Sequence, residues 1–568
     1  MITRSLRILT VAAVATVVSF PSQAATRLAS IYFESFATLQ AQVQQAAQVF
    51  QAPQLGTLPL LVGMRVPGAI QMNNEKPIAI HIMDMGRGPV ALVYDVAPSG
   101  TAEAYLHALA GAGIALPTPT DGYYLLENGL AARIAGDRLL LAPQARRPEM
   151  WFGGNLGTMP PIPDMPGAVR VAIAPAAFES MLKQFRQRMA AAPAGSPPLA
   201  GVNTDAAQKV LDFYARLLSE MDGIYLGIEA QPEGLFIRSS LMTRPGSDLA
   251  SLVGSMQPAT PRQLAFIDRN SLFGYASGLV TLPPALKQQF IDLYVGMGAL
   301  APTATGLSGD EWSELMKDSL GTIGVPLAMQ GTLQAGSRAL LLQGLMGVPD
   351  PSAYLASQLA LQKSPAFKKI SPVVFSEPVT RSYKSVAILS VSNRFDEAAW
   401  ERQLRASMPS NLPPDRAVAS LQPARAMMQA LMQIVGGPSE YAATPAGLAF
   451  GLGASSMIEQ AVDRALAASS SAPEAGRIGE LLAQAAPVHA MGRLSLSALL
   501  DRVAPLPPPE AAAPAPPPAS PEASAILYAD WNVASELRSV WLLPTSEIQA
   551  IRVRLPTMNR ARQPRPQP

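Results

Sequence analysis

The chain of 568 residues carries 43 Lys and Arg against 41 Asp and Glu, so its net charge is only +2 at pH 7. Nucleic-acid binding needs clustered cations, and a chain with 15% charged residues of nearly balanced sign argues against a nucleic-acid partner. Cysteine is absent from the sequence, which excludes disulfides, thiolate catalysis, cysteine metal ligands and an N-terminal lipid anchor.

The N-terminus has the order of a secretory signal peptide. Arg4 and Arg7 form a basic start, an apolar run of 13 residues covers 8–20, and Ala24 ends a small-x-small cleavage site. The alternative is a membrane anchor that is retained, but the run is shorter than the ~20 residues that a spanning helix needs. We therefore expect a signal peptide over residues 1–24, cleavage near Ala24, and a periplasmic or secreted product with no integral membrane segment.

In the first half of the chain, short alternating strands are interleaved with segments that have apolar residues at helical spacing. In chain order we expect a strand at 28–33, a helix at 38–50, a hairpin from 77, a helix at 104–110, strands within 123–141, a strand at 169–173, a helix at 178–189 and a hairpin over 224–242. Strands that pair locally through hairpins favour an antiparallel sheet with packed helices.

The second half continues in the same style. We expect a strand at 272–278, a helix around 286–294, a hairpin from 326, a strand at 386–392, a helix at 397–408, a helix at 426–435, strands within 441–458, a strand at 492–496, a hairpin over 526–543 and a last strand at 547–555. Two segments fall outside this pattern. Residues 506–521 form a proline-rich loop, and the basic, proline-rich residues 558–568 are predicted to be a disordered tail.

An internal repeat organises these elements. Residues 77–106 and 326–355 both open on Pro, run through two strands and close on Ala-Tyr-Leu. A weaker match places Tyr123-x5-Gly-Leu-Ala opposite Tyr441-x5-Gly-Leu-Ala, and the unequal spacing requires an insertion at about 361–423. We therefore predict an α+β protein with two related halves, 25–258 and 259–557, that arose by internal duplication.

Candidate catalytic residues are few. Ser180 and Lys183 match the S-x-x-K pattern in which a serine and a lysine on one helix share a proton, as in penicillin-binding enzymes. The K-T-G and S-x-N elements of those enzymes do not follow, and the alternative is a surface helix with Phe178 and Leu182 facing inward. His81 aligns with Gln330 in the repeat, so the fold does not require an imidazole there. We expect neither a metal site nor a cofactor.

A Met- and aromatic-rich segment is the candidate for ligand binding. Five residues with large apolar side chains fall within a stretch rich in Gly and Pro: Met150, Trp151, Phe152, Met159 and Met165. Because Met is adaptable and polarisable, such a segment suits a pocket for an apolar ligand. The alternative is a loop that packs flat on its own domain.

The hairpin YLGIEAQPEGLFIRSSL at 225–241 and the layout of the halves resemble large, uncharacterised secreted bacterial proteins built as two α+β halves. The resemblance implies the fold class and assigns no site. Two functions remain open from the sequence. The first is an exported, non-catalytic envelope protein that binds an apolar small molecule or an envelope protein, or acts as a scaffold. The alternative is a periplasmic hydrolase with its site in the cleft between the halves.

Overall fold

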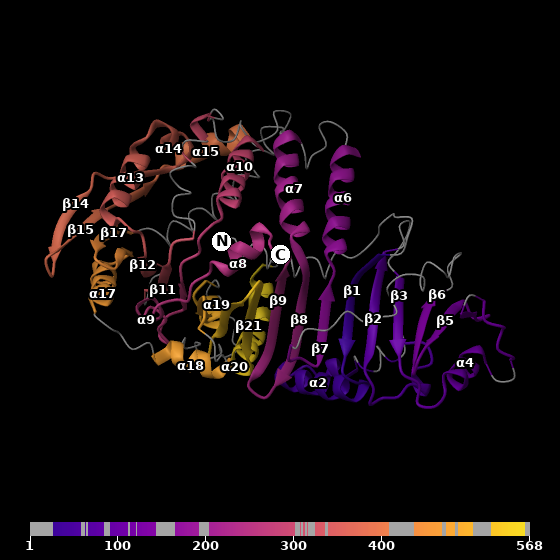
Figure 1. Cartoon of the computed structure of the whole chain (residues 1–568). Coiled ribbons are helices and arrows are strands. Elements are labelled where there is room, and N and C mark those ends of the chain that lie inside the picture. The colour runs from indigo at the N-terminus through magenta and orange to yellow at the C-terminus, as the bar shows by residue number, and fades with distance from the viewer. Residues whose placement is uncertain are drawn as a thin grey trace, which may run out of the picture. The chain divides into compact units, whose positions relative to one another are not determined.

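The computed structural model describes residues 26–57, 59, 63, 66–84, 91–111, 114–120, 122–143, 165–191, 204–300, 307, 310–312, 315, 324–334, 339–407, 437–467, 473–482, 487–503 and 524–562. Helices and strands are mixed, and the strands form a large antiparallel sheet, as the α+β prediction required (Figure 1). The chain divides into two compact units. The first unit comprises Met1–Ala190 and Ala215–Arg244, and the second comprises Ala191–Tyr214 and Pro245–Pro568.

The first unit holds nine strands and the helices that connect them, within the described residues. The elements are β1 (Thr26–Phe33), α2 (Phe36–Val49), η1 (Pro53–Thr57), η2 (Ala69–Gln71), β2 (Ile78–Asp84), β3 (Ala91–Val96), α4 (Ala102–Ala110), β4 (Tyr123–Leu125), β5 (Leu130–Ala135), β6 (Arg138–Pro143), β7 (Val169–Ile173), α6 (Pro175–Ala191), β8 (Met221–Gln231) and β9 (Gly234–Thr243). The helix α7 (Thr204–Ser219) precedes β8, and its residues up to Tyr214 are assigned to the second unit. Pairing runs in the order β4-β5-β6-β3-β2-β1-β7-β8-β9.

The period of β2 explains how this unit builds its core. Ile78 and Ile80 point to the face on which α2 and α4 pack, where they join Leu39 and Tyr105 in one apolar cluster. His81 alternates with them and lies on the opposite face. Caps fix the two helices in place: the Ser35 side chain accepts a hydrogen bond from the first turn of α2, and Thr101 does the same for α4.

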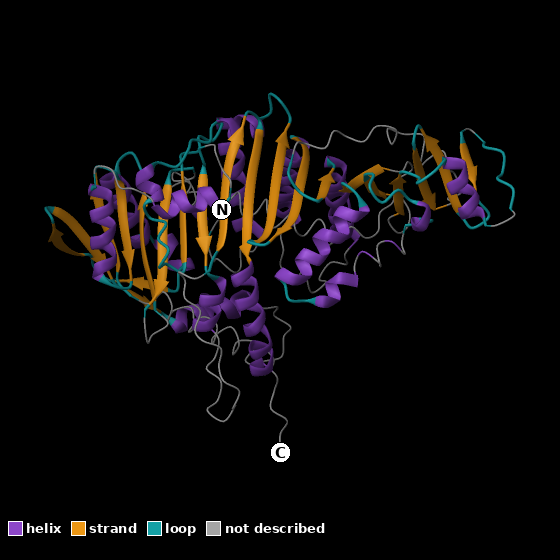
Figure 2. Ribbon diagram, turned by 90° about the horizontal axis from the view of Figure 1, so that it is seen from below, coloured by secondary structure: helices purple, strands orange, loops and turns teal. Residues whose placement is uncertain are grey.

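The second unit contains the remaining described elements. They are α8 (Asp248–Gly254), α9 (Pro261–Leu264), β10 (Phe273–Ser277), α10 (Pro284–Leu300), β11 (Leu327–Leu333), β12 (Leu340–Met346), α13 (Pro351–Lys363), α14 (Pro365–Ile370), β13 (Val373–Phe375), β14 (Val379–Tyr383), β15 (Val386–Val391), β16 (Asn393–Phe395), α15 (Glu397–Ser407), β17 (Ser439–Thr444), β18 (Gly447–Leu452), α17 (Ser455–Leu466), α18 (Pro473–Leu481), β19 (Ala490–Leu494), α19 (Leu496–Val503), β20 (Ile526–Val533), β21 (Glu536–Pro544) and α20 (Thr545–Arg562). Figure 2 separates these helices and strands by colour.

Strand pairing in the second unit runs in the order β14-β15-β17-β18-β12-β11-β10-β19-β20-β21. α17 packs on β12, β17 and β18. Glu440 of β17 lies on the face that carries α17, and its neighbour Tyr441 lies on the other face, which α13 covers. Figure 1 shows α13 and α17 on opposite sides of this part of the sheet.

The two pairing orders follow the same path. In each unit the first strand lies between the hairpin that follows it and a later strand, namely β7 beside β1 and β19 beside β10. The weaker sequence match does not fit this path. Its Gly-Leu-Ala sequence begins β5 in the first unit, but β6 is the strand beside β3; in the second unit it begins β18, which pairs directly with β12. Tyr123 and Tyr441 therefore do not occupy matching strands.

Two sequence predictions fail at the C-terminus. Residues 547–555 belong to α20, not to a strand, and the helix continues to Arg562 into the predicted tail. A tertiary contact outweighs the local pattern here, because the fully buried Glu547 carboxylate accepts hydrogen bonds from the backbone and hydroxyl of Ser497, at 2.7 and 2.6 Å. The predicted helix at 426–435 and the proline-rich loop at 506–521 lie outside the described residues. No described helix is long and apolar enough to cross a membrane.

Candidate functional site

The sequence-predicted serine and lysine lie on one helix of the first unit. Ser180 is half-buried and Lys183 is exposed, three residues apart on α6. Phe178 and Leu182 on the same helix are buried. This is the amphipathic arrangement of a helix with one buried and one exposed face.

The candidate ligand-binding segment is described only at its end, because Met150, Trp151, Phe152 and Met159 lie outside the described residues. Met165 is buried and sits above Gly227, where a Cβ atom would come within 3.2 Å of its Sδ and Cγ atoms. With Tyr32 and Tyr225 it lines a cavity of ≈ 10 Å³. A volume near 10 Å³ holds about one water molecule and is far below the ~300 Å³ of small-molecule sites.

Two histidines are buried in hydrogen-bonded positions. His81 lies with Nδ1 2.8 Å from the hydroxyl oxygen of Ser30, and both residues are only 1% exposed. Burial, assisted by the charges of Arg27 and Arg138, lowers the pKa of His81 to about 4. The imidazole is therefore neutral at pH 7 and a weak base, which argues against a catalytic serine–histidine pair. The Nδ1 atom of His489 lies 2.8 Å from the carbonyl oxygen of Gln257.

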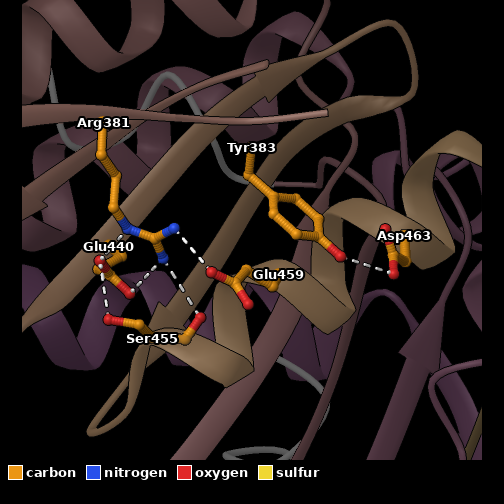
Figure 3. A network of polar contacts seen from close by, with 6 residues as sticks. All are labelled: Arg381, Tyr383, Glu440, Ser455, Glu459 and Asp463. Atoms are coloured by element: carbon orange, nitrogen blue, oxygen red, sulfur yellow. Dashed lines mark hydrogen bonds and ion pairs between the residues drawn. The ribbon is translucent and has the colours of Figure 1, made fainter. Parts of the chain in front are cut away.

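A polar network among the described residues of the second unit joins β14 to α17, and the sequence analysis missed it. We call it the β14–α17 cluster; it comprises Arg381, Tyr383, Lys384, Glu440, Ser455, Glu459 and Asp463. Alternation along β14 places Arg381 and Tyr383 on one face of the strand. On α17 the polar residues recur every four positions, which gives one stripe along the helix. Figure 3 shows the two β14 side chains directed at this stripe.

Arg381 is the centre of the cluster. Its Nη1 donates to Glu459 at 2.7 Å, and its Nε and Nη2 lie 3.3 and 3.5 Å from the Glu440 carboxylate. Nη2 also donates to the Ser455 carbonyl at 3.3 Å (Figure 3). Burial alone would lower the pKa of the guanidinium, but the hydrogen bonds and charges of the two glutamates raise it overall. Arg381 is thus a permanent cation held by two carboxylates.

The burial of the two partners is unequal. The Glu440 side chain is 3% exposed, whereas that of Arg381 is 32% exposed. A carboxylate that leaves water loses its hydration, and only a well-placed cation and further donors offset that loss. Arg381 supplies the cation, and the Ser455 hydroxyl lies 3.5 Å from the same carboxylate. Arg381 on β14 therefore compensates the buried negative charge of Glu440 on β17.

Asp463 holds the end of the β14–β15 hairpin. Its carboxylate accepts hydrogen bonds from Lys384 Nζ at 2.7 Å and from the Tyr383 hydroxyl at 3.1 Å. The hydrogen bond to Asp463 raises the pKa of Lys384. The loop consists of Lys384 and Ser385, with φ of 48° and 66°. Two-residue hairpin loops favour positive φ at both positions, but Gly and Asn adopt that conformation more readily than Lys or Ser. Asp463 therefore anchors a loop with strained backbone.

The cluster combines three carboxylates with two cations, and each of these charges has a partner within the chain. Nothing in this arrangement activates a nucleophile. Within the part of the chain that the structure describes, no group of three or more His, Cys, Asp or Glu side chains is placed to hold a metal ion. The sequence contains one signal for this cluster, the four-residue spacing from Ser455 to Glu459 to Asp463, which predicts a polar stripe on a helix. The spacing does not indicate which strand the stripe faces.

Comparison with known proteins adds no identity: no family model, curated protein or solved structure matches this chain.

Proposed function

We propose that this chain is an exported, non-catalytic protein of the cell envelope that serves as a rigid scaffold for binding a protein partner. The observation that carries the proposal is the β14–α17 cluster, in which the charges satisfy one another. Catalytic groups are typically poised for proton or charge transfer, with pKa values tuned to that task. Here ionic pairing stiffens the edge of the sheet, as suits a surface that presents a fixed shape.

Export rests on the N-terminal sequence. The basic residues Arg4 and Arg7, the apolar run over 8–20 and the site at Ala24 together favour delivery to the periplasm or the exterior. A cysteine-free chain suits that oxidising compartment, because it folds without disulfide pairing.

We further infer that the two units descend from one duplicated unit. The shared path of strand pairing supports this, together with the matching sequences at 77–106 and 326–355. The insertion predicted at about 361–423 contains β14, which has no counterpart among the described strands of the first unit. The β14 side of the polar cluster is therefore an addition to the second copy. Features confined to one copy of a duplication are suited to a function that the other copy lacks.

A protein partner is favoured over an apolar small molecule. Met165, the described end of the Met-rich segment, is already buried against Gly227, and its cavity has room for about one water. By contrast, β14 carries the exposed Val379 at the margin of the second unit's strand order. An exposed strand of this kind is suited to protein contact.

Native mass spectrometry of the protein purified from its own envelope tests the proposal. We expect a discrete added mass that releases a polypeptide. A bare monomer mass after mild crosslinking would contradict binding, and release of a lipid would replace the protein partner by an apolar ligand. Hydrolysis of generic ester or β-lactam substrates that is lost in Ser180→Ala and retained in the matched variant Ser219→Ala would establish the hydrolase alternative instead.

A further inference from the structure

We propose that the outer edge of β14 binds an extended peptide segment of the partner as an added antiparallel strand. This inference rests on the proposed function and names the surface that performs it. β14 pairs with β15 on one side, and no other described strand pairs with it on the other. A sheet edge of this kind presents backbone donors and acceptors that an incoming strand can satisfy.

The hairpin register identifies which backbone groups point outward. The loop residues are Lys384 and Ser385, so Tyr383 and Val386 close the hairpin. A two-residue loop closes with a hydrogen bond between these flanking residues, and the bonding direction alternates along an antiparallel strand. The N–H and C=O groups of Thr380 and Ser382 consequently point away from β15. Both residues are exposed. They offer two donors and two acceptors to a new strand.

The charged side chains that normally protect a sheet edge are committed elsewhere on β14, and Pro378 directly before the strand limits a new pairing to Val379–Tyr383. Edge strands usually avoid pairing by means of charged side chains, proline or a bulge. On β14 the guanidinium of Arg381 is held by Glu440 and Glu459, and the neighbouring Lys384 is held by Asp463. The exposed residues of β14 are Val379, Thr380 and Ser382, whose side chains are small or apolar. Val379 is 67% exposed. An apolar side chain opposite Arg381 on the incoming strand would lie diagonally beside Val379 and Tyr383.

Charge decides the kind of peptide. The β14–α17 cluster has three carboxylates against two cations, and both cations are already paired. Because Glu440 is only 3% exposed, the exposed part of the cluster has two carboxylates and two cations that pair with one another, so the segment that binds is uncharged where it faces β14. Self-pairing with a second copy is disfavoured in the register that joins Thr380 to Ser382. That register would place Arg381 directly opposite its own copy, and like charges in that position are destabilising.

Proline substitution tests the edge with little risk to the fold. Proline is tolerated on an edge strand where its N–H would face solvent, and it removes one donor. Ser382→Pro is thus expected to keep the melting temperature of the wild type and to lose binding. The matched control is Thr380→Ala, which changes a side chain on the same edge but leaves the backbone donors intact.

The probe is a phage-displayed library of random linear ten-residue peptides, panned on the full-length protein. We expect selected peptides to be uncharged over the residues that pair with β14, to lose about tenfold in affinity against Ser382→Pro, and to bind Thr380→Ala as they bind wild type. If Ser382→Pro does not fold, amide exchange of the wild type decides: bound peptide slows exchange at Thr380 and Ser382 and leaves Arg381 unchanged.

Three results would overturn the edge proposal: no peptide is selected, selected peptides bind Ser382→Pro unchanged, or the protein forms a dimer that Ser382→Pro abolishes. The last would assign the edge to a second copy. None of these results decides the proposed function, which fails separately if native mass spectrometry finds only the bare monomer. A partner that is retained equally by wild type and Ser382→Pro places the binding surface elsewhere and contradicts the edge proposal alone.

Discussion

The hydroxyl oxygen of Ser30 lies 2.8 Å from Nδ1 of His81, across two adjacent strands of the first unit. Both residues are almost fully buried, and the pKa of His81 is lowered to about 4, chiefly by burial. The unfolded chain, with an ordinary histidine pKa near 6.5, binds a proton that the folded chain rejects. Stability contributed by the neutral imidazole is therefore present above about pH 6.5 and is lost as the pH falls toward 4.

We predict that the free energy of unfolding decreases by about 3 kcal/mol between pH 7 and pH 4 because of His81 alone. Urea titrations at a series of pH values measure this slope. In His81→Gln the slope over this range becomes shallower, since glutamine does not titrate. Gln40→Ala, at an exposed position on α2, changes no titrating group, serves as the control and keeps the wild-type slope. An unchanged slope in His81→Gln would contradict the prediction.

The unequal burial of Arg381 and Glu440 gives a second prediction. Arg381→Met leaves a carboxylate with 3% exposure without its main cation, and we expect it to lower the free energy of unfolding by about 2 kcal/mol. The double variant Arg381→Met with Glu440→Leu removes both charges and is expected to recover most of the loss. Chemical denaturation of the wild type, the two single variants and the double variant forms the cycle. Additive losses would show that the two side chains are not coupled.

Sequence patterns predicted the elements whose packing is local. The alternation of Ile78 and Ile80 along β2 identifies a strand with one apolar face, and the structure places both residues against α2 and α4. Pairing between neighbouring strands in the chain follows from short loops. The pairing of β1 with β7 does not follow in this way, because their join depends on a register that no local pattern encodes.

The missed features share one physical cause, which is long-range polar pairing. Glu547 lies in a segment with strand-like alternation, yet its contact with Ser497 holds it in a helix. Arg381 and Glu459 are separated by 78 residues, so their ion pair was invisible in either segment alone. Half of the site, the stripe on α17, had a detectable spacing. The other half required residues 379–383 to pair with β15 as the edge strand β14.

The strained loop of the β14–β15 hairpin yields a third prediction. Ser385 has φ of 66°, a conformation that costs a residue with a Cβ atom but not glycine. Ser385→Gly is expected to raise the free energy of unfolding by about 0.5–1 kcal/mol, because relief of strain exceeds the added entropy of the unfolded chain. The comparison variant is Ser382→Gly, which places glycine within β14 and is expected to destabilise. Thermal unfolding measures the melting temperatures of both variants. A Ser385→Gly variant that melts below the wild type would contradict the prediction.

Met165 packs against Gly227, and this close contact gives a fourth prediction. A Cβ atom at position 227 would lie 2.5 Å from the backbone oxygen of Pro166 and 3.2 Å from Met165 Sδ, so backbone and side chain would both have to move. We expect Gly227→Ala to lower the free energy of unfolding by about 2–3 kcal/mol, as overpacked sites do. Gly100→Ala, where a Cβ would meet nothing within 4 Å, is the matched control and is expected to be neutral. Equal stability of the two variants in urea would mean that the chain over Gly227 yields easily. Met165 would then be able to move off the sheet. That result would again favour the hypothesis that the Met-rich segment binds an apolar ligand.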